Sequence, residues 1–254
     1  MPPAARLGPP LAAGQPPIAV LVDFDGTIAR GDVTAAVMRA NLAPGRALPW
    51  DEGSRLTWPD MMREAADRFP PEPGRLLAEA ARIPLDRAFT RLAARAASAG
   101  VAMEVVSDGF GFFIQPALER LDAGWVPIAS GDTQFGPART RVEFPHGNPD
   151  CSACGTCKRN RVLAHQAAGR RVAFVGDGES DRYAAGYADV VFAKAGLVGI
   201  CEANGLAYRE WTTFDDVTAW LAEQLAAFTA DPASAPGPVV RSLFCGAEVW
   251  GPQL

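Results

Sequence analysis

The sequence contains few of the residues on which several common classes of protein depend. It has two histidines, His146 and His165, which excludes catalytic schemes that need several imidazoles, such as a histidine-rich zinc hydrolase. Its five cysteines are too few and too unevenly spaced for a secreted disulfide framework, so we expect reduced thiols. Carboxylates therefore remain as the main candidates for catalytic groups.

Long apolar runs and clusters of basic residues are also absent. No apolar run approaches the roughly 18 to 20 residues that cross a bilayer, and prolines interrupt the first residues where a signal peptide has its apolar segment. The net charge is −5, without the basic stripe that binds nucleic acids or anionic membranes. These features predict a cytoplasmic protein with no nucleic-acid or membrane partner, whose ligand is a small molecule.

The residues that are present indicate a globular α/β protein. Of the 254 residues, 48% are hydrophobic and 21% are charged, which is enough to bury a sizeable core. Apolar runs rich in β-branched residues alternate with helical patterns, as in parallel strands joined by helices. We expect strands at 18–24, 101–108, 171–177 and 189–194, and helices at 85–99, 112–121, 160–168 and 213–228. The expected fold is a doubly wound, Rossmann-like, mostly parallel sheet.

Composition divides the chain into four parts. Residues 1–17 hold six prolines and are expected to form a disordered tail. The core domain is expected at 18–30 and 85–228, and the helical patterns of 31–84 predict a cap inserted into it. Residues 229–254 form a C-terminal tail whose role the sequence leaves open.

The strongest chemical signal is Asp23-Phe24-Asp25-Gly26-Thr27, directly after the first strand. Residues two apart on an extended chain point the same way, so both carboxylates can reach one centre, and Gly26 allows the backbone to turn. The alternative is a solvated turn with side chains that cap a helix. A second acidic cluster favours the paired-carboxylate interpretation.

This second cluster contains Asp177 and Asp181, at the junction between a strand and a helix. Its carboxylates suit Mg²⁺, although capping of the following helix is the alternative. Ser107 ends another strand, and Lys158 opens a helical pattern; a hydroxyl and an ammonium are groups that bind phosphate oxygens. Because ligands of open α/β sheets bind beyond the carboxyl ends of the strands, we expect these side chains to converge in one crevice.

DFDGT, VSDG, Lys158 and GDGESD, in this order, resemble the four motifs of the haloacid dehalogenase (HAD) superfamily of Mg²⁺-dependent phosphatases. The helical insert resembles the type I cap of the phosphoserine phosphatase branch. The stretch from PHGNPDCSACGTCK to GDGESD resembles the phosphatases of methionine salvage, which act on 2-hydroxy-3-keto-5-methylthiopentenyl-1-phosphate, and their relatives that act on phosphocholine and phosphoethanolamine.

The resemblance implies roles for the acidic residues. Asp23 would be the nucleophile that forms an aspartyl-phosphate, and Asp25 the general acid and then the general base. Asp23, Asp177 and the carbonyl of Asp25 would bind Mg²⁺, with Asp181 as an outer-shell carboxylate. Dehalogenases of this superfamily lack a carboxylate at the position of Asp25, which argues against dehalogenation.

The resemblance also implies the groups that hold the substrate phosphate. Thr27, Ser107 and the backbone of Gly109 would bind the phosphoryl oxygens. Lys158 would pair with both Asp23 and the phosphoryl group.

A cysteine-rich segment precedes Lys158. His146, Cys151, Cys154 and Cys157 offer four ligands for a structural Zn²⁺ that would order this segment. The alternative is a loop of reduced cysteines rich in glycine and proline.

Two features of the cap bear on the substrate. Asp32 resembles an acidic residue that contacts substrate in the phosphoserine branch, and the alternative is that it caps the helix that follows it. Trp50, Trp58, Met61 and Met62 are candidates for an apolar substrate pocket or for packing within the cap.

The sequence predicts a Mg²⁺-dependent phosphomonoesterase that acts on a small phosphorylated metabolite through an aspartyl-phosphate. The methionine-salvage enol-phosphate, phosphoserine, phosphocholine and phosphoethanolamine are the candidate substrates. A phospho-receiver signalling module is disfavoured because it needs roughly half this length and no cap. A non-catalytic interaction protein with a cysteine-rich metal clip is disfavoured because every motif position holds a competent residue type.

Overall fold

The computed structural model describes residues 11–41, 48, 56–149 and 151–238. The outer parts of both predicted tails and Trp50 lie outside the described residues. Within the described chain, residues 11–17 form turns, and the first strand begins at Ile18, as predicted.

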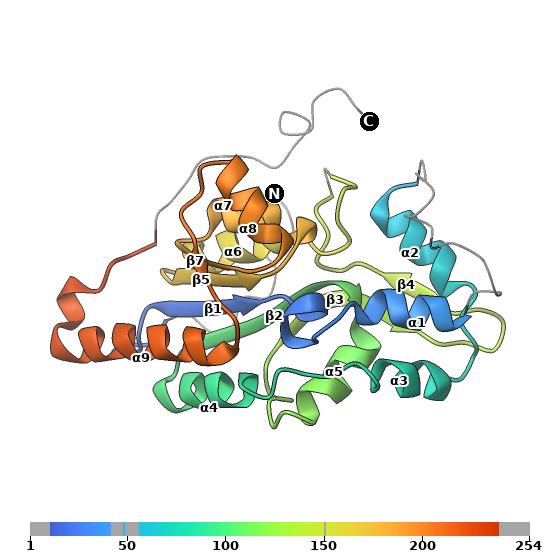
Figure 1. The fold of residues 1–254 in the computed structure, drawn as a ribbon, viewed down its shortest axis with the longest axis horizontal. Helices are drawn as coiled ribbons and strands as arrows, with labels where there is room; N and C mark the ends of the chain where they lie inside the picture. The colour runs from blue at the N-terminus through green and yellow to red at the C-terminus, as the bar shows by residue number, and fades with distance from the viewer. Residues whose placement is uncertain (1–10, 42–47, 49–55, 150, 239–254) are drawn as a thin grey trace.

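The centre of the structure is a seven-stranded sheet with the order β4-β3-β2-β1-β5-β6-β7 (Figure 1). The strands are β1 (Ile18–Val22), β2 (Ala102–Phe110), β3 (Ile128–Gln134), β4 (Arg141–Glu143), β5 (Arg171–Gly176), β6 (Val190–Ala193) and β7 (Arg209–Glu210). Neighbouring strands are parallel except β4, which pairs antiparallel to β3. The predicted fold class is confirmed. The sequence patterns missed β3, β4 and β7 because these strands lie toward the sheet edges and carry no continuous apolar run.

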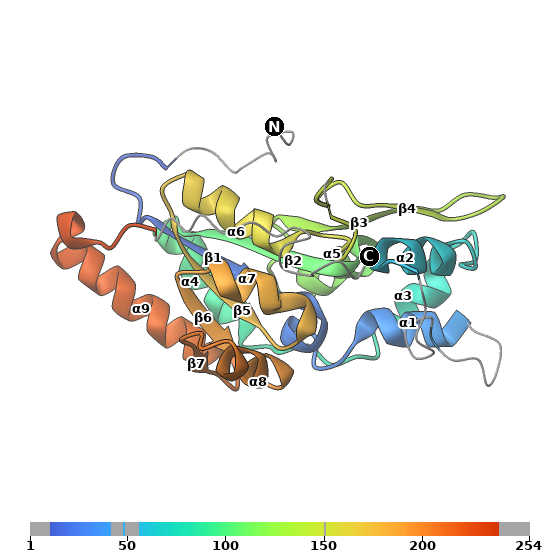
Figure 2. The ribbon, with the colours of Figure 1, turned by 90° about the horizontal axis from the view of Figure 1, so that it is seen from above.

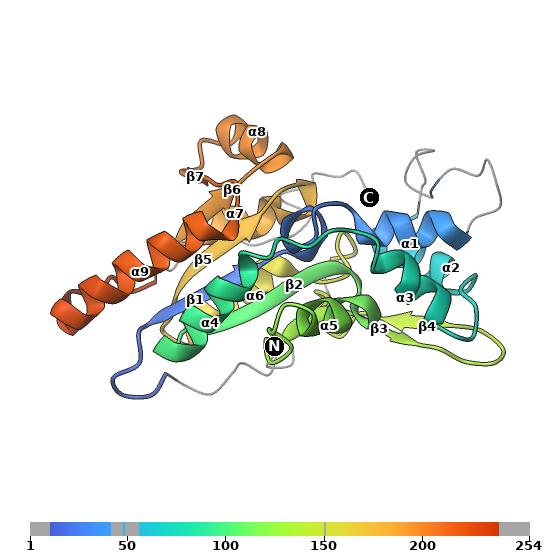
Figure 3. The same ribbon diagram turned by 60° about the horizontal axis from the view of Figure 1, so that its bottom comes forward.

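Helices cover both faces of the sheet (Figures 1 and 3). One face carries α4 (Phe89–Ala99), α5 (Gly111–Glu119) and α9 (Phe214–Ala230), and the other carries α6 (Lys158–Ala167), α7 (Arg182–Tyr187) and α8 (Gly196–Ala203). Strand β1 is fully buried, with Val20 and Val22 in one apolar cluster and Leu21 in the other. Burial on both faces is why β1 reads as an uninterrupted apolar run. None of the described helices is long and apolar enough to cross a membrane.

Of the described α-helices between β1 and β2, the first three gather at one end of the molecule (Figure 2). They are α1 (Val33–Asn41), α2 (Trp58–Ala66) and α3 (Gly74–Ala80). The chain enters and leaves this segment side by side, because the N–H of Arg30 donates to the carbonyl of Pro84 at 2.8 Å. Adjacent ends allow a helical segment to be inserted without disturbing the sheet. The division into core and cap at residues 30 and 85 remains our prediction.

Candidate active site

Two neighbouring strands end at the same edge of the sheet and bring three acidic residues together. Asp23 follows β1, and Asp177 follows β5, its parallel neighbour. Asp181 lies in the 3₁₀ turn after β5 and is fully buried. One carboxylate oxygen from each of these three residues lies within 4.8 Å of the others. Residues 158 positions apart in the sequence therefore form one acidic cluster because the parallel topology aligns their strand ends.

Lys158 reaches into this cluster from the first residue of α6. Its side chain is 2% exposed, and Nζ donates to Asp23 Oδ1 at 2.6 Å, Asp181 Oδ1 at 2.7 Å and Ser180 Oγ at 2.9 Å. Burial by itself would lower the pKa of Lys158, but the carboxylates of Asp181 and Asp23 raise it, and the net effect is a raised pKa. Lys158 is therefore an ammonium across the physiological pH range.

Two carboxylates of the cluster, those of Asp23 and Asp177, have raised pKa values. Burial and the nearby Asp181 raise the pKa of Asp23 well above its usual value, although Lys158 lowers it. Burial and Asp181 also raise the pKa of Asp177 to about 6. The pKa of Asp177 is raised even though the ammonium groups of Lys158 and Lys194 lower it, so a bound cation would stabilise the ionised form of the cluster.

The donor set fits Mg²⁺, because all the candidate ligands are carboxylate oxygens. Both oxygens of Asp181 already accept hydrogen bonds: Oδ1 from Lys158, and Oδ2 from the N–H groups of Asp177 at 2.9 Å and Gly178 at 3.2 Å. Asp181 therefore orients the lysine and the start of the turn. Asp23 and Asp177 are left as the carboxylates that can bind the metal directly.

Asp25 belongs to the same turn but faces the cap. Its Oδ1 accepts the N–H of Val33 at 2.8 Å and its Oδ2 accepts the hydroxyl of Thr34 at 2.7 Å, both at the start of α1. Burial, with a smaller contribution from the charge of Asp32, raises the pKa of Asp25 to about 7. A carboxyl group with this pKa can both donate and accept a proton near neutral pH.

Asp32 itself caps α1, because its Oδ1 accepts the N–H of Ala35 at 2.7 Å. This contact matches the capping alternative considered for Asp32 and leaves its contact with substrate a prediction. The structure gives Asp32 a second effect, through the field that it exerts on Asp25.

Replacing Asp32 with asparagine is expected to shift the pH profile of activity. Asparagine caps a helix as well as aspartate does, so α1 is retained. Removing the negative charge lowers the pKa of Asp25, and a reaction that needs protonated Asp25 then declines at a lower pH. The measurement is kcat/KM for an alkyl phosphomonoester across the pH range on both sides of neutrality. Asp60→Asn, at the start of α2, is the control, and an unshifted alkaline limb in Asp32→Asn would contradict the prediction.

Besides Lys158, the residues expected to bind phosphate lie in β2 and in the turn after β1. Ser107 is buried, and its Oγ accepts the N–H of Gly109 at 3.1 Å. A Cβ on Gly109 would lie 2.4 Å from Thr34 Oγ1, so this position has no room for a side chain. Thr27 is different: it is fully buried and its hydroxyl donates to Asp177 Oδ1 at 3.3 Å. Thr27 thus supports the carboxylate of Asp177, and its contact with a phosphoryl oxygen stays a prediction.

Gly26 is expected to be essential, for two reasons. Its φ is +70°, which L-residues other than glycine rarely adopt, and a Cβ there would lie 2.0 Å from Asp177 Oδ2. Gly26→Ala should therefore displace Asp177 and weaken Mg²⁺-dependent activity far more than it lowers the melting temperature. Gly169→Ala is the matched control, because Gly169 has φ +81° with no atom within 4 Å of the added Cβ. Equal losses of activity in both variants would refute this prediction.

A buried ionic network holds α6 against the sheet. Glu104 of β2 accepts from Arg161 at 2.7 Å and lies 3.1 Å from Nε2 of His165. All three side chains are almost fully buried, so the network fixes the helix that carries Lys158. His165 is thus part of the framework, which the sequence gave no means of recognising.

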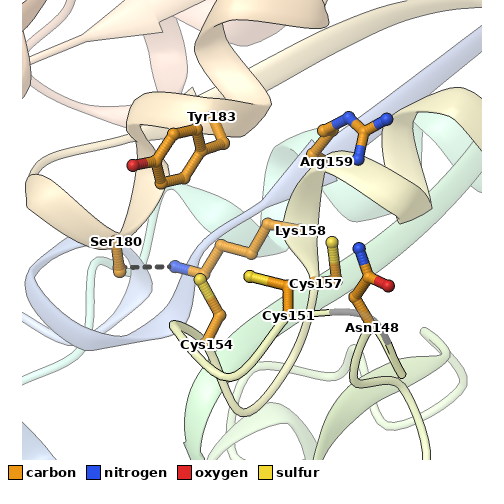
Figure 4. A pocket seen from close by; sticks show the side chains of 8 residues that line it. All are labelled: Asn148, Cys151, Cys154, Cys157, Lys158, Arg159, Ser180 and Tyr183. Carbon is orange, nitrogen blue, oxygen red and sulfur yellow. Dashed lines mark hydrogen bonds between the residues drawn. The ribbon is translucent and has the colours of Figure 1, made fainter. Parts of the chain in front are cut away.

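The structure gives no support to the predicted zinc site. Among the described residues, the only group of three potential ligands within 4.8 Å is the acidic cluster of Asp23, Asp177 and Asp181. His146 contributes its main-chain carbonyl, which accepts the N–H of Cys157 at 2.9 Å. The three cysteines line a small cavity beside Lys158 (Figure 4), with Asn148, Arg159, Ser180 and Tyr183. Backbone hydrogen bonds such as that from Cys157 to His146 hold the described part of the segment.

Ser180 was not singled out as a site residue from the sequence, whereas Trp58 and Met62 were named as candidates in the cap. Ser180 binds the Lys158 ammonium, and it lies within the GDGESD run that carries Asp177 and Asp181. Trp58 donates its indole N–H to the carbonyl of Asp108 at 3.1 Å, so it contacts the core and does not only pack within the cap. Met62, in contrast, is fully buried in the apolar core, as the packing alternative expected.

Comparison with known proteins agrees with this geometry. The profile of the haloacid dehalogenase-like hydrolases matches residues 20–186, which include every motif of the site. The chain belongs to this family. The family resemblance predicted from the motifs is confirmed, as is the prediction that the protein is an enzyme of this type.

Relatives with curated names are similar over most of the chain. A 2-hydroxy-3-keto-5-methylthiopentenyl-1-phosphate phosphatase from Exiguobacterium sibiricum is 30% identical over 210 residues, which cover 79% of this chain and 94% of the relative. The protein of the same name from Brevibacillus brevis is 25% identical over 215 residues, covering 79% and 93%. A solved structure of substrate-bound phosphoserine phosphatase has a TM-score of 0.58 at 16% identity, covering 80% of this chain and 97% of that one. This last likeness concerns the fold.

Proposed function

We propose that this HAD-family hydrolase is a Mg²⁺-dependent phosphomonoesterase that works through an aspartyl-phosphate. The observation that carries the proposal is the meeting of Asp23, Lys158 and Asp177 at one edge of the sheet, with Asp25 directly beside them. A nucleophile, a counter-charge, a metal ligand and a proton donor are the groups that phosphoryl transfer requires.

Asp23 is the proposed nucleophile. Its Oδ1 is held by Lys158, which leaves the second oxygen to attack phosphorus. The oxygen of the leaving alcohol departs with the proton of Asp25, which then takes a proton from the water that hydrolyses the aspartyl-phosphate. Lys158 neutralises charge on the phosphoryl oxygens, and Ser107 with the Gly109 backbone binds them from the other side.

Asp23 and Asp177, with the carbonyl of Asp25, are the proposed Mg²⁺ ligands. When bound, the ion would offset negative charge on the carboxylates and polarise the phosphoryl group. Thr27 and Asp181 hold the metal-binding region in place through Oδ1 of Asp177 and its main-chain N–H.

We propose a small phosphorylated metabolite as the substrate and favour the methionine-salvage enol-phosphate. Support comes from relatives of that name that cover about four-fifths of this chain. Phosphoserine, phosphocholine and phosphoethanolamine are the alternatives.

The test is phosphate release from these four esters by the wild type and Asp23→Asn, each with Mg²⁺ and with EDTA. We expect release to require both Asp23 and Mg²⁺, and the ester with the highest kcat/KM to identify the substrate branch. Equal release by the wild type and Asp23→Asn would refute the mechanism. Release of phosphate from none of the esters, with the protein folded, would count against the proposed function.

A further inference from the structure

Asp108 lies where three parts of the molecule meet. It is the residue of β2 between Ser107 and Gly109, and it is 9% exposed. Gly109 faces Asp25 and Thr34, as the short distances to a Cβ at Gly109 show. The carboxylate of Asp108 turns instead to the cysteine-rich segment that precedes α6.

The carboxylate of Asp108 accepts hydrogen bonds from the backbone of that segment. Its Oδ1 accepts the N–H of Thr156 at 2.7 Å, and the N–H of Gly155 also bonds to this carboxylate. The carbonyl of Thr156 in turn accepts the N–H of Lys158 at 2.9 Å. One side chain of β2 thus fixes the two residues that lead into Cys157 and Lys158.

The main chain of Asp108 is held from the opposite side. Its carbonyl accepts the indole N–H of Trp58, from α2 of the cap, at 3.1 Å. The strand that carries Ser107 is therefore tied both to the cap and to the segment before Lys158. Neither contact is local: 48 residues separate Asp108 from Thr156, and 50 separate it from Trp58.

We propose that Asp108 is a positioning residue, which fixes Gly155 and Thr156 and thereby sets the place where the Lys158 ammonium meets Asp23. Glu104 holds α6 at Arg161 and His165, whereas Asp108 holds the backbone directly before the first turn of the helix. Lys158 must reach three acceptors at 2.6 to 2.9 Å, which leaves little tolerance for movement of its backbone.

The charge of Asp108 adds to this effect. Burial raises the pKa of Asp108 to about 6, which is still below neutral pH. The carboxylate is therefore ionised at neutral pH and accepts both backbone N–H groups.

The first test is a double-mutant cycle between Asp108 and Lys158, and it rests on the proposed phosphatase function. The variants are Asp108→Ala, Lys158→Met and the double variant, assayed as full chains with p-nitrophenyl phosphate and Mg²⁺. We expect Asp108→Ala to lower kcat roughly 10²-fold, as misplacement of a catalytic group does. In the Lys158→Met background, Asp108→Ala should leave kcat almost unchanged, because the ammonium that Asp108 positions is already absent. Asp108→Asn, which keeps one acceptor oxygen, should recover part of the activity.

The second test needs no turnover and separates the proposal from the function. Cys157 is 5% exposed and lies between the anchored Thr156 and Lys158. Release of the segment should therefore expose its thiol. We expect a disulfide reagent such as dithionitrobenzoate to label Cys157 markedly faster in Asp108→Ala than in the wild type, with the labelled residue identified by peptide mass mapping.

Asp189→Ala is the matched control for both tests. Asp189 also accepts a backbone N–H, from Val172 at 2.8 Å, but at the opposite end of β5. Its loss should lower stability without changing kcat or the labelling of Cys157. The proposal is overturned if the effects of Asp108→Ala and Lys158→Met on kcat multiply, or if Cys157 is labelled at the wild-type rate in Asp108→Ala. If the wild type releases no phosphate, the proposed function fails, and the labelling alone supports or overturns the anchoring by Asp108.

Discussion

Asp23→Asn is expected to abolish phosphate release while leaving the protein at least as stable as the wild type. Loss of a covalent nucleophile costs at least about 10⁴-fold in kcat. The effect on stability follows from the sign of the pKa shift. Burial and Asp181 raise the pKa of Asp23, so the ionised carboxylate lowers the free energy of unfolding at neutral pH. A neutral amide at this position does not have this effect.

The measurement combines phosphate release with thermal unfolding in EDTA and in Mg²⁺. In EDTA the melting temperature of Asp23→Asn should equal or exceed that of the wild type. Mg²⁺ should raise the melting temperature of the wild type by mass action and that of Asp23→Asn much less, because a ligand is lost. A large drop in melting temperature in EDTA would show instead that the pair with Lys158 stabilises the fold.

Asp25→Asn is expected to accumulate a phosphoenzyme. Asparagine cannot donate a proton to the leaving group or accept one from water, and loss of general acid–base catalysis costs about 10² to 10⁴-fold. The p-nitrophenolate leaving group needs little protonation. With p-nitrophenyl phosphate, Asp23 should therefore still be phosphorylated while hydrolysis stalls.

The readout is a burst of p-nitrophenolate close to one equivalent per enzyme, with a phosphoryl group on the peptide that contains Asp23. The control is Asp60→Asn, an exposed carboxylate of α2, which should turn over like the wild type without accumulating phosphoenzyme. Steady turnover by Asp25→Asn without a burst would assign the proton transfers to another group. Asp25→Asn should also lower the free energy of unfolding by about 1 kcal/mol, because the amide can replace only one of the two acceptor oxygens that bind Val33 and Thr34.

Much of this site could be predicted from the sequence because the two acidic motifs each follow a strand that is recognisable by itself. The apolar runs before Asp23 and Asp177 are buried on both faces, and such strands are the easiest to identify. The rule that ligands bind beyond the carboxyl ends of parallel strands then places these residues together. The edge strands were missed for the opposite reason, since β4 and β7 are short and largely exposed.

The sequence by itself therefore determined the fold class, the family and the set of acidic and basic groups, because these depend on local patterns. Tertiary structure alone decided which atoms these groups contact. The hydroxyl of Thr27 donates to Asp177, and the carboxylate of Asp108 holds the cysteine-rich segment. Such contacts join residues 48 to 150 positions apart, and their formation depends on how strands and helices pack, which no local spacing encodes.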